Sequence, residues 1–257
     1  MNKHSIAGEI YVLKIGGSVL TDKGEIRKAR KATIKRISKE IVQAAPKNLI
    51  LVHGAGSFGH PQAKVYLKSR ELKDALITHE AVKELNWLVV SALTDCGQKA
   101  IPLHPLSAVV SKGGKIVYKL NDQIELALKQ GIIPVLHGDI ILDDEDGFCI
   151  VSGDQLVVYA AKEFKASRVG LGTDVDGVFD DSGVVIRNLT LQDVEKQNIK
   201  GSEHVDVTGG MKEKVELLVQ LAARYKIRAV LFNAAEESNV VKFLRGDDDL
   251  VGTVVTG

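Results

Sequence analysis

The residues best placed to do chemistry lie in a glycine-rich stretch that ends in histidine. The run from Gly54 to Gly59 follows four apolar residues, 49–52, that predict a buried strand, and His60 closes the run. Glycine lets a ligand approach the backbone closely because it has no Cβ. A helix that begins here would present free N–H groups and a positive dipole end, which favour an anion. The stretch therefore predicts a phosphate site that carries its own imidazole, a switchable hydrogen-bond donor.

The same glycines also fit the dinucleotide fingerprint G-x-G-x-x-G, at Gly54, Gly56 and Gly59. A dinucleotide site needs a second strand that ends in Asp or Glu about twenty residues later, to hold the ribose. Residues 71–98 have a helical pattern instead, so we disfavour this alternative. For His60 the alternative is a surface position on a helix.

Two other histidines, His53 and His137, stand at the ends of predicted strands. We interpret both as structural residues.

Three lysines are candidates to surround a transferred phosphoryl group. Lys14 stands near the end of the apolar strand 10–15, before a Gly-Gly-Ser turn, and Lys23 stands in the next loop. Lys214 lies one turn into a helix opened by residues 209–210. Phosphoryl transfer needs positioning and positive charge around the transferred group. A lone lysine is usually a surface residue. Two of these, however, stand next to glycine turns that can bind anions, and no Walker A pattern occurs.

Three acidic residues near strand ends complete the candidate set. Asp154, at a helix start, is expected to hold two lysine ammonium groups apart and in place. The helix dipole alone would also favour Asp154 there. Asp174 and Asp176 either contact nucleotide ribose or a bound metal, or simply end a strand.

The composition is that of an ordinary globular protein. The chain has 257 residues, 45% apolar and 26% charged, which is enough for one large α/β domain or two joined lobes. A net charge of +1 gives no reason to expect nucleic acid as a partner. The first nine residues lack a secretory core, and no apolar run reaches the length of a membrane span. Two distant cysteines, Cys96 and Cys149, are expected to be free thiols in a reducing cytoplasm.

Strand and helix patterns alternate along the chain, which predicts a mainly parallel sheet covered on both faces. Ligands bind such sheets at the carboxyl ends of the strands. Each candidate turn joins a strand or hairpin to the next element with Gly beside Ser, Thr or Asp. We expect strands at 10–15, 49–52, 101–104, 132–137, 168–173, 228–233 and 252–255, hairpins within 108–118, 140–151 and 178–187, and helices at 27–45, 61–69, 72–98, 121–130, 153–164 and 211–225.

These motifs, in this order, resemble the amino acid kinase family over nearly the whole length. The segments that carry the resemblance are 14–18, 53–56, 152–155, 173–177 and 206–214. The resemblance implies an open, three-layer αβα sandwich of about eight strands, formed by residues 1–257 as one domain. It also implies an acceptor lobe over about residues 1–165 and an ATP lobe over about residues 166–257.

Within that family the segment 54–61, with its histidine, is similar to the isopentenyl phosphate kinase group, as are the segments 136–140 and 150–154. The resemblance implies ATP-dependent phosphorylation of isopentenyl phosphate, with Mg²⁺, in isoprenoid biosynthesis. It also suggests a homodimer. A kinase for another small phosphate or phosphonate, similar to fosfomycin kinase, and a non-catalytic nucleotide-binding module are the alternatives.

The resemblance also implies roles for individual residues. Lys14 and Lys214 would hold ATP phosphates, Lys23 would stabilise the transferring group, His60 would donate to the acceptor's phosphate, and Asp154 would orient the lysines. No protein ligand to a metal is assigned. The remaining ATP contacts would be Gly16, Gly17, Ser18, Gly56, Thr173, Asp174, Asp176, Gly177 and Gly210, and the remaining acceptor contacts would be Ala55, Gly56, Gly59, Gly153, Ile140, Ile150, Ala75 and Thr78.

An acceptor that is already a phosphate needs no strong general base, because it ionises by itself. It does need a donor that offsets the repulsion between two anions, which an imidazole can supply without a permanent charge. The small side chains expected at Ala75 and Thr78 would leave room for a longer isoprenoid tail.

Overall fold

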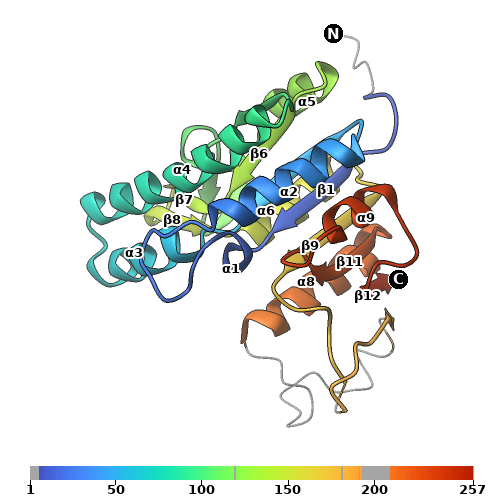
Figure 1. The fold of residues 1–257 in the computed structure, drawn as a ribbon. Helices are drawn as coiled ribbons and strands as arrows, with labels where there is room; N and C mark the ends of the chain where they lie inside the picture. The colour runs from blue at the N-terminus through green and yellow to red at the C-terminus, as the bar shows by residue number, and fades with distance from the viewer. Residues whose placement is uncertain (1–5, 119, 181, 191, 193–208, 257) are drawn as a thin grey trace.

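An eight-stranded, mainly parallel sheet forms the middle layer of the molecule (Figure 1), in the order β10-β12-β11-β9-β1-β2-β6-β3. The computed structural model describes residues 6–118, 120–180, 182–190, 192 and 209–256. In this sheet only β11 and β12 run antiparallel among the pairs described. Its strands are β1 (Tyr11–Ile15), β2 (Leu49–His53), β3 (Ala100–Pro102), β6 (Ile133–His137), β9 (Arg168–Thr173), β10 (Asn188–Thr190), β11 (Arg228–Asn233) and β12 (Gly252–Thr256).

Helices cover both faces of this sheet, because alternate strand residues point to opposite sides. In β2, Ile50 and Val52 join one core cluster while Leu49 and Leu51 join the other. The first cluster includes residues of α5 (Asn121–Lys129), α6 (Gly153–Glu163) and α8 (Gly209–Tyr225). The second includes residues of α1 (Gly17–Leu20), α2 (Lys31–Ala44), α3 (Gly56–Ser69), α4 (Leu72–Asp95) and α9 (Asn239–Arg245). The expected three-layer αβα architecture is confirmed.

A second, four-stranded sheet in the order β5-β4-β7-β8 stands beside the main one. Its strands are β4 (Val110–Lys112), β5 (Lys115–Tyr118), β7 (Asp139–Asp143) and β8 (Gly147–Val151), and the short helix η1 (Pro105–Ser107) precedes β4. Two of the expected hairpins, β4-β5 and β7-β8, are confirmed.

The third expected hairpin, within residues 178–187, is present but too short to be assigned as a pair of strands. One antiparallel bridge joins Phe179 to Val185 there. The strand β10 follows it and pairs with the last strand, β12. Its three residues are too few for their alternation to be recognised in the sequence.

The helix after the glycine-rich stretch begins earlier than the expected residue 61. Helix α3 begins at Gly56, so Pro61 lies inside it rather than in its first turn. A proline inside a helix cannot donate to the carbonyl four residues before it. Here that carbonyl, of Ser57, accepts from the backbone N–H of Arg27 at 3.1 Å instead. This contact explains why the helix tolerates proline. Because α3 begins at Gly56, His60 also lies within the helix.

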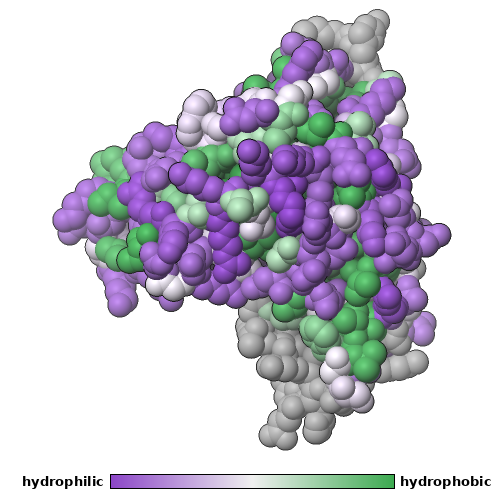
Figure 2. Space-filling view, viewed as in Figure 1, coloured by the Kyte–Doolittle hydropathy of each residue, from purple (hydrophilic) through white to green (hydrophobic). Residues whose placement is uncertain are grey.

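No helix within the described parts of the chain is both long and apolar enough to cross a membrane. Figure 2 shows one face of the molecule as mainly hydrophilic, with apolar side chains interspersed. Exposed apolar side chains of α3 and α4 include Leu67, Leu72 and Leu76.

Candidate active site

A cleft of about 530 Å³ opens at the carboxyl ends of β1, β2, β6 and β9. It lies where the expected turns meet, between the helices that follow these strands. Residues from segments far apart in the sequence line it: Lys14, Gly16, Gly17, Ser18, Lys23, Gly54, Ala55, Gly59, His60, Ala63, Thr78, Val82, Gly138, Asp139, Ile150, Val151, Ser152, Gly153, Asp154, Thr173, Asp174, Val175, Met211, Glu213 and Lys214.

Two glycine turns form the floor of the cleft by packing backbone against backbone. A Cβ added to Gly17 would lie 2.3 Å from the nitrogen of Gly56, and one added to Gly54 would lie 2.6 Å from the nitrogen of Gly17. Gly56 also has φ +49°, a conformation that glycine adopts without strain. The Thr21 hydroxyl joins the turns by accepting from the N–H of Ser57 at 3.0 Å. The glycines therefore bring the loop after β1 and the start of α3 into contact.

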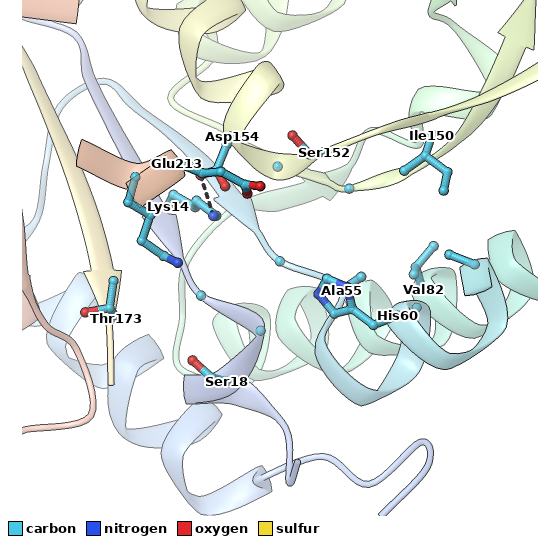
Figure 3. Close-up of a pocket in the computed structure, with 18 of the residues that line it drawn as sticks. Lys14, Ser18, Ala55, His60, Val82, Ile150, Ser152, Asp154, Thr173 and Glu213 are labelled. Atoms are coloured by element: carbon cyan, nitrogen blue, oxygen red, sulfur yellow. Dashed lines mark hydrogen bonds and ion pairs between the residues drawn. The ribbon is translucent and has the colours of Figure 1, made fainter. Parts of the chain in front are cut away.

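Lys14 and Asp154 form an ion pair in the cleft. The Lys14 ammonium donates to Oδ1 of Asp154 at 2.5 Å, and the two side chains are 9% and 27% exposed. Figure 3 shows this contact at the centre of the charged part of the cleft. The expected partnership of this carboxylate with one of the two lysines is present.

The start of α6 holds Asp154 in place. The Ser152 hydroxyl accepts from the N–H of Gln155 at 3.1 Å, and the Gln155 side chain accepts from the N–H of Ser152 at 2.7 Å. This reciprocal pair is a capping box, and it fixes the first turn of the helix. The N-terminus of α6 therefore faces the cleft with its positive dipole end.

Lys214, in the first turns of α8, brings a second positive charge to the same cleft. Burial and the positive charge of Lys14 lower the pKa of Lys214, and the charge of Asp154 acts in the opposite direction. The two ammonium groups thus lie near a single carboxylate, which leaves excess positive charge. This excess charge would favour a polyanion between them.

Lys23 and Ser18 both contact Asp174, at the end of β9. Lys23 donates to Oδ2 and the Ser18 hydroxyl donates to Oδ1, each at 2.9 Å. Burial by itself raises the pKa of Asp174, but the hydrogen bonds from Lys23 and Ser18 outweigh it and lower the pKa. The side chain of Lys23 is 70% exposed, so it lies at the rim of the cleft.

His60 lies between the charged and the apolar parts of the cleft, beside Ala55 (Figure 3). His60 is exposed to solvent, although surrounding atoms partly desolvate its ring. This desolvation, followed by the positive charges of Lys14, Lys64 and Lys214, lowers the pKa of His60. The imidazole is therefore neutral at neutral pH and can donate one hydrogen bond.

The far end of the cleft is apolar. Ala63, Val82 and Ile150 line it together with Thr78, whose hydroxyl donates to the carbonyl of Asp74 at 2.8 Å. The expected contacts Ala75 and Ile140 do not line it; they are fully buried and pack with Tyr66 behind Ile150.

Four further expected residues also lie outside the lining. Gly56 is covered by the turn of Gly17, and the Asp176 carboxylate accepts from Asn233 at 2.9 Å. Gly177 packs against Thr253, and Gly210 lies at the start of α8. Residues 206–208, part of the motif that precedes α8, lie outside the described residues.

Several residues that line the cleft were not predicted as site residues, among them Ala63, Val82, Asp139 and Glu213. Val82 had a usable signal, because it follows the expected Thr78 by one helical turn. Glu213 had none, since acidic residues are common on exposed helices.

A layer of buried and half-buried polar groups lies beneath the cleft. His53 and His137 face each other in the register of β2 and β6, with their rings stacked 5.5 Å apart. His104 and His79 extend this layer, and His79 contacts both carboxylate oxygens of Asp139 at 3.0 Å. Burial lowers the pKa of His53 to about 4 and that of His137 well below its usual value, and burial raises the pKa of Asp139.

Comparisons with known proteins agree on one family. Residues 9–233 match the Amino acid kinase family. An isopentenyl phosphate kinase of Methanocaldococcus jannaschii is 37% identical, covering 93% of this chain and 96% of the relative. Solved structures of isopentenyl phosphate kinases superpose well: one has a TM-score of 0.83 at 31% identity, covering 96% of this chain and 100% of the other. A product complex of the T. acidophilum enzyme has a TM-score of 0.77 at 26% identity, covering 96% and 99%.

Proposed function

This chain belongs to the amino acid kinase family, and from that premise we propose that it transfers the γ-phosphoryl group of ATP to isopentenyl phosphate, yielding isopentenyl diphosphate and ADP. The observation that carries the proposal is the polarity of the cleft. Lys14 and Asp154 lie on one side, Val82 and Ile150 lie on the other, and His60 stands between them (Figure 3). Lys214 also lines the cleft, and its pKa responds to the charges of Lys14 and Asp154. A phosphate monoester with a short apolar tail has the same polarity.

The acceptor's phosphate oxygen attacks the γ-phosphorus, forming one P–O bond while the bond from that phosphorus to the β–γ bridging oxygen breaks. ADP leaves with the electron pair, so no proton has to be removed from a dianionic acceptor. Lys14 and Lys214 stabilise the charge on the transferred group. His60 and the N–H groups of Ala55 and Gly153 hold the acceptor's phosphate.

The other expected site residues fit this proposal at the rim and floor of the cleft. Lys23 would stabilise the transferring group if its pair with Asp174 rearranged when ATP bound. Gly16, Gly17, Ser18 and Thr173 would contact the nucleotide, with the acceptor lobe over about residues 1–165 and the nucleotide lobe over about residues 166–257.

We propose that Mg²⁺ enters with ATP. Magnesium in kinases is usually held by substrate phosphates, water and one or two carboxylates, rather than by an all-protein cage. The carboxylates of Asp154, Asp174 and Glu213 line the cleft and suit this role. When bound, the ion would neutralise charge on the phosphates.

A coupled assay of ADP release tests the function. Isopentenyl phosphate, dimethylallyl phosphate, geranyl phosphate and fosfomycin are offered in parallel with ATP and Mg²⁺. We expect the highest kcat/KM with isopentenyl phosphate. Strong turnover of fosfomycin without turnover of isopentenyl phosphate would establish a phosphonate kinase, and ATP binding without any transfer would establish a nucleotide-binding module.

The expected dimer rests on the family resemblance, whereas the expected location and partners rest on the composition of the chain. We propose a homodimer that works in the cytoplasm, without a nucleic-acid or membrane partner. Sedimentation of the purified protein tests the dimer, and a monomer at working concentration would contradict it.

A further inference from the structure

We propose that His53 is a positioning residue for the acceptor's phosphate: it holds the Gly54–Ala55 peptide so that the Ala55 N–H faces the cleft. This inference rests on the proposed function, which places that phosphate at the turn between β2 and α3. It concerns a residue that the substrate itself does not touch.

The contacts of Gly54 are the basis of the inference. His53 is fully buried at the end of β2, and its Nδ1 lies 3.0 Å from the carbonyl oxygen of Gly54. Because a carbonyl only accepts, Nδ1 carries the proton and donates. The N–H of Gly54 donates to the carbonyl of Ile15 at 2.9 Å, so both peptides around Gly54 are held.

Peptide geometry carries this restraint to Ala55. In a trans peptide the C=O and the next N–H point in opposite directions. Every peptide bond in the described residues is trans. A donor on the buried side that holds the Gly54 carbonyl therefore turns the Ala55 N–H away from the core, toward the cleft that both residues line.

A second contact fixes the same tautomer of His53. The amide Nδ2 of Asn86 lies 3.1 Å from Nε2 of His53, and it also donates to the carbonyl of Val135 at 3.4 Å. Nε2 must therefore be the unprotonated acceptor, which leaves the proton on Nδ1. Burial keeps the pKa of His53 far enough below neutrality for this neutral tautomer to persist.

The neighbouring strand end repeats the arrangement. Nδ1 of His137 lies 3.1 Å from the carbonyl of Gly138, and Nδ1 of His104 lies 2.9 Å from Nε2 of His137. The same neutral tautomer thus satisfies both rings. At Gly138 the turn packs on the backbone of Gly153, where an added Cβ would lie 3.1 Å from the Gly153 nitrogen. The first His-Gly pair therefore holds the turn that supplies the Ala55 N–H, and the second holds a turn that packs on the Gly153 backbone.

Two substitutions separate positioning from plain structural support. In His53→Asn the amide N–H replaces Nδ1 and can still donate to Gly54, but Asn86 loses its acceptor. In His53→Gln the longer side chain reaches Asn86, but the donor to Gly54 is lost. His53→Asn should therefore be the less stable variant but the better binder of the acceptor, and His53→Gln should be the reverse.

We expect His53→Gln to lower kcat/KM for isopentenyl phosphate by about 10- to 100-fold, through KM more than kcat, the range for a lost hydrogen bond to a charged group. The KM for ATP should stay within about twofold. His53→Asn should recover kcat/KM to within about threefold of the parent protein, even where its melting temperature is lower. Activity that follows melting temperature, or an equal rise in both KM values, would overturn the proposal.

A measurement on the unmodified protein serves where a variant does not fold. In ¹⁵N-labelled protein titrated with inorganic phosphate, the Ala55 amide resonance should shift downfield, and the His53 ring nitrogens should report a proton on Nδ1. A proton on Nε2, or an Ala55 resonance that phosphate does not move, would overturn it. This measurement needs no turnover. A failure of the proposed function would instead appear as a lack of phosphorylation of isopentenyl phosphate, so the two failures can be told apart.

Discussion

The ammonium of Lys14 lies 2.5 Å from the carboxylate of Asp154, although 140 residues separate them in the chain. Asp154 reaches this contact from the first turn of α6, whereas Lys14 reaches it from β1. The ion pair fixes the Lys14 ammonium at a position where it could contact a bound phosphate. Its loss should therefore affect catalysis more than folding.

Replacing Asp154 with Asn should lower kcat by about 10- to 100-fold, because Lys14 loses the partner that orients it. The free energy of unfolding should fall by only about 1–2 kcal/mol, since the carboxylate is partly exposed. Steady-state kinetics and urea unfolding measure the two effects. In a double-mutant cycle with Lys14→Met the losses in kcat should be less than additive; full additivity would mean that the two residues act independently.

Replacing His60 with Ala should lower kcat/KM for isopentenyl phosphate by about 100-fold or more, the scale of a lost catalytic donor. ATP affinity, measured by calorimetry, should stay near that of the parent protein, because the ring is assigned to the acceptor. His60→Gln, which keeps a donor, should recover part of the loss. An equal loss of ATP affinity and turnover would mean that the imidazole supports the fold instead.

The pH dependence of turnover should come from the acceptor and not from His60. The pKa of His60 is lowered, so its ring is neutral above about pH 6.5 and stays a neutral donor as the pH rises. A phosphate monoester takes up a proton near pH 6, which makes it a poorer nucleophile. Turnover should therefore fall below about pH 6 in both the parent protein and His60→Gln. If turnover of His60→Gln no longer fell at acid pH, the fall seen in the parent protein would come from His60.

The fold was largely predictable from the sequence, because long apolar strands and amphipathic helices carry their own period. The start of α3 was not, since Pro61 favours a first-turn position, and the contact from the Arg27 N–H to the carbonyl left free by Pro61 joins segments far apart in the sequence. At the site, the expected glycine turns and lysines meet in one cleft. The positions of Ala75 and Ile140 behind Ile150, rather than in the lining, follow from packing with Tyr66 that spacing alone does not reveal.

Substituting Gly54 with Ala should disrupt the cleft, because the new Cβ would lie 2.6 Å from the backbone nitrogen of Gly17. We expect a loss of about 1–3 kcal/mol in the free energy of unfolding and a large loss of turnover. Gly24→Ala is the matched control, since the nearest atom to its Cβ would be 3.7 Å away. Similar behaviour of the two variants would show that the contact between the turns is not required.

Acid should destabilise the protein through the buried histidine layer. Below its usual pKa of 6.5 His53 takes up a proton in the unfolded chain, but in the folded protein only near pH 4. The free energy of unfolding therefore falls as the pH drops through this window, by about 2 kcal/mol at pH 5 from His53 alone. The raised pKa of Asp139 acts in the opposite direction over its own range. Urea unfolding at pH 7 and pH 5 measures this loss in the free energy of unfolding. In His53→Asn the loss should be smaller by about 2 kcal/mol. A loss as large as in the parent protein would show that His53 is not its source.

In the proposed reaction two anions meet across a cationic gap, with the acceptor's phosphate held by His60. A crystal structure with a non-hydrolysable ATP analogue and isopentenyl phosphate tests it most directly. We predict the acceptor's phosphate within hydrogen-bond reach of the His60 ring and the Ala55 N–H, its tail toward Val82 and Ile150, and the γ-phosphate against Lys14 and Lys214. An acceptor phosphate bound away from His60, or a tail that points toward the lysines, would contradict the account.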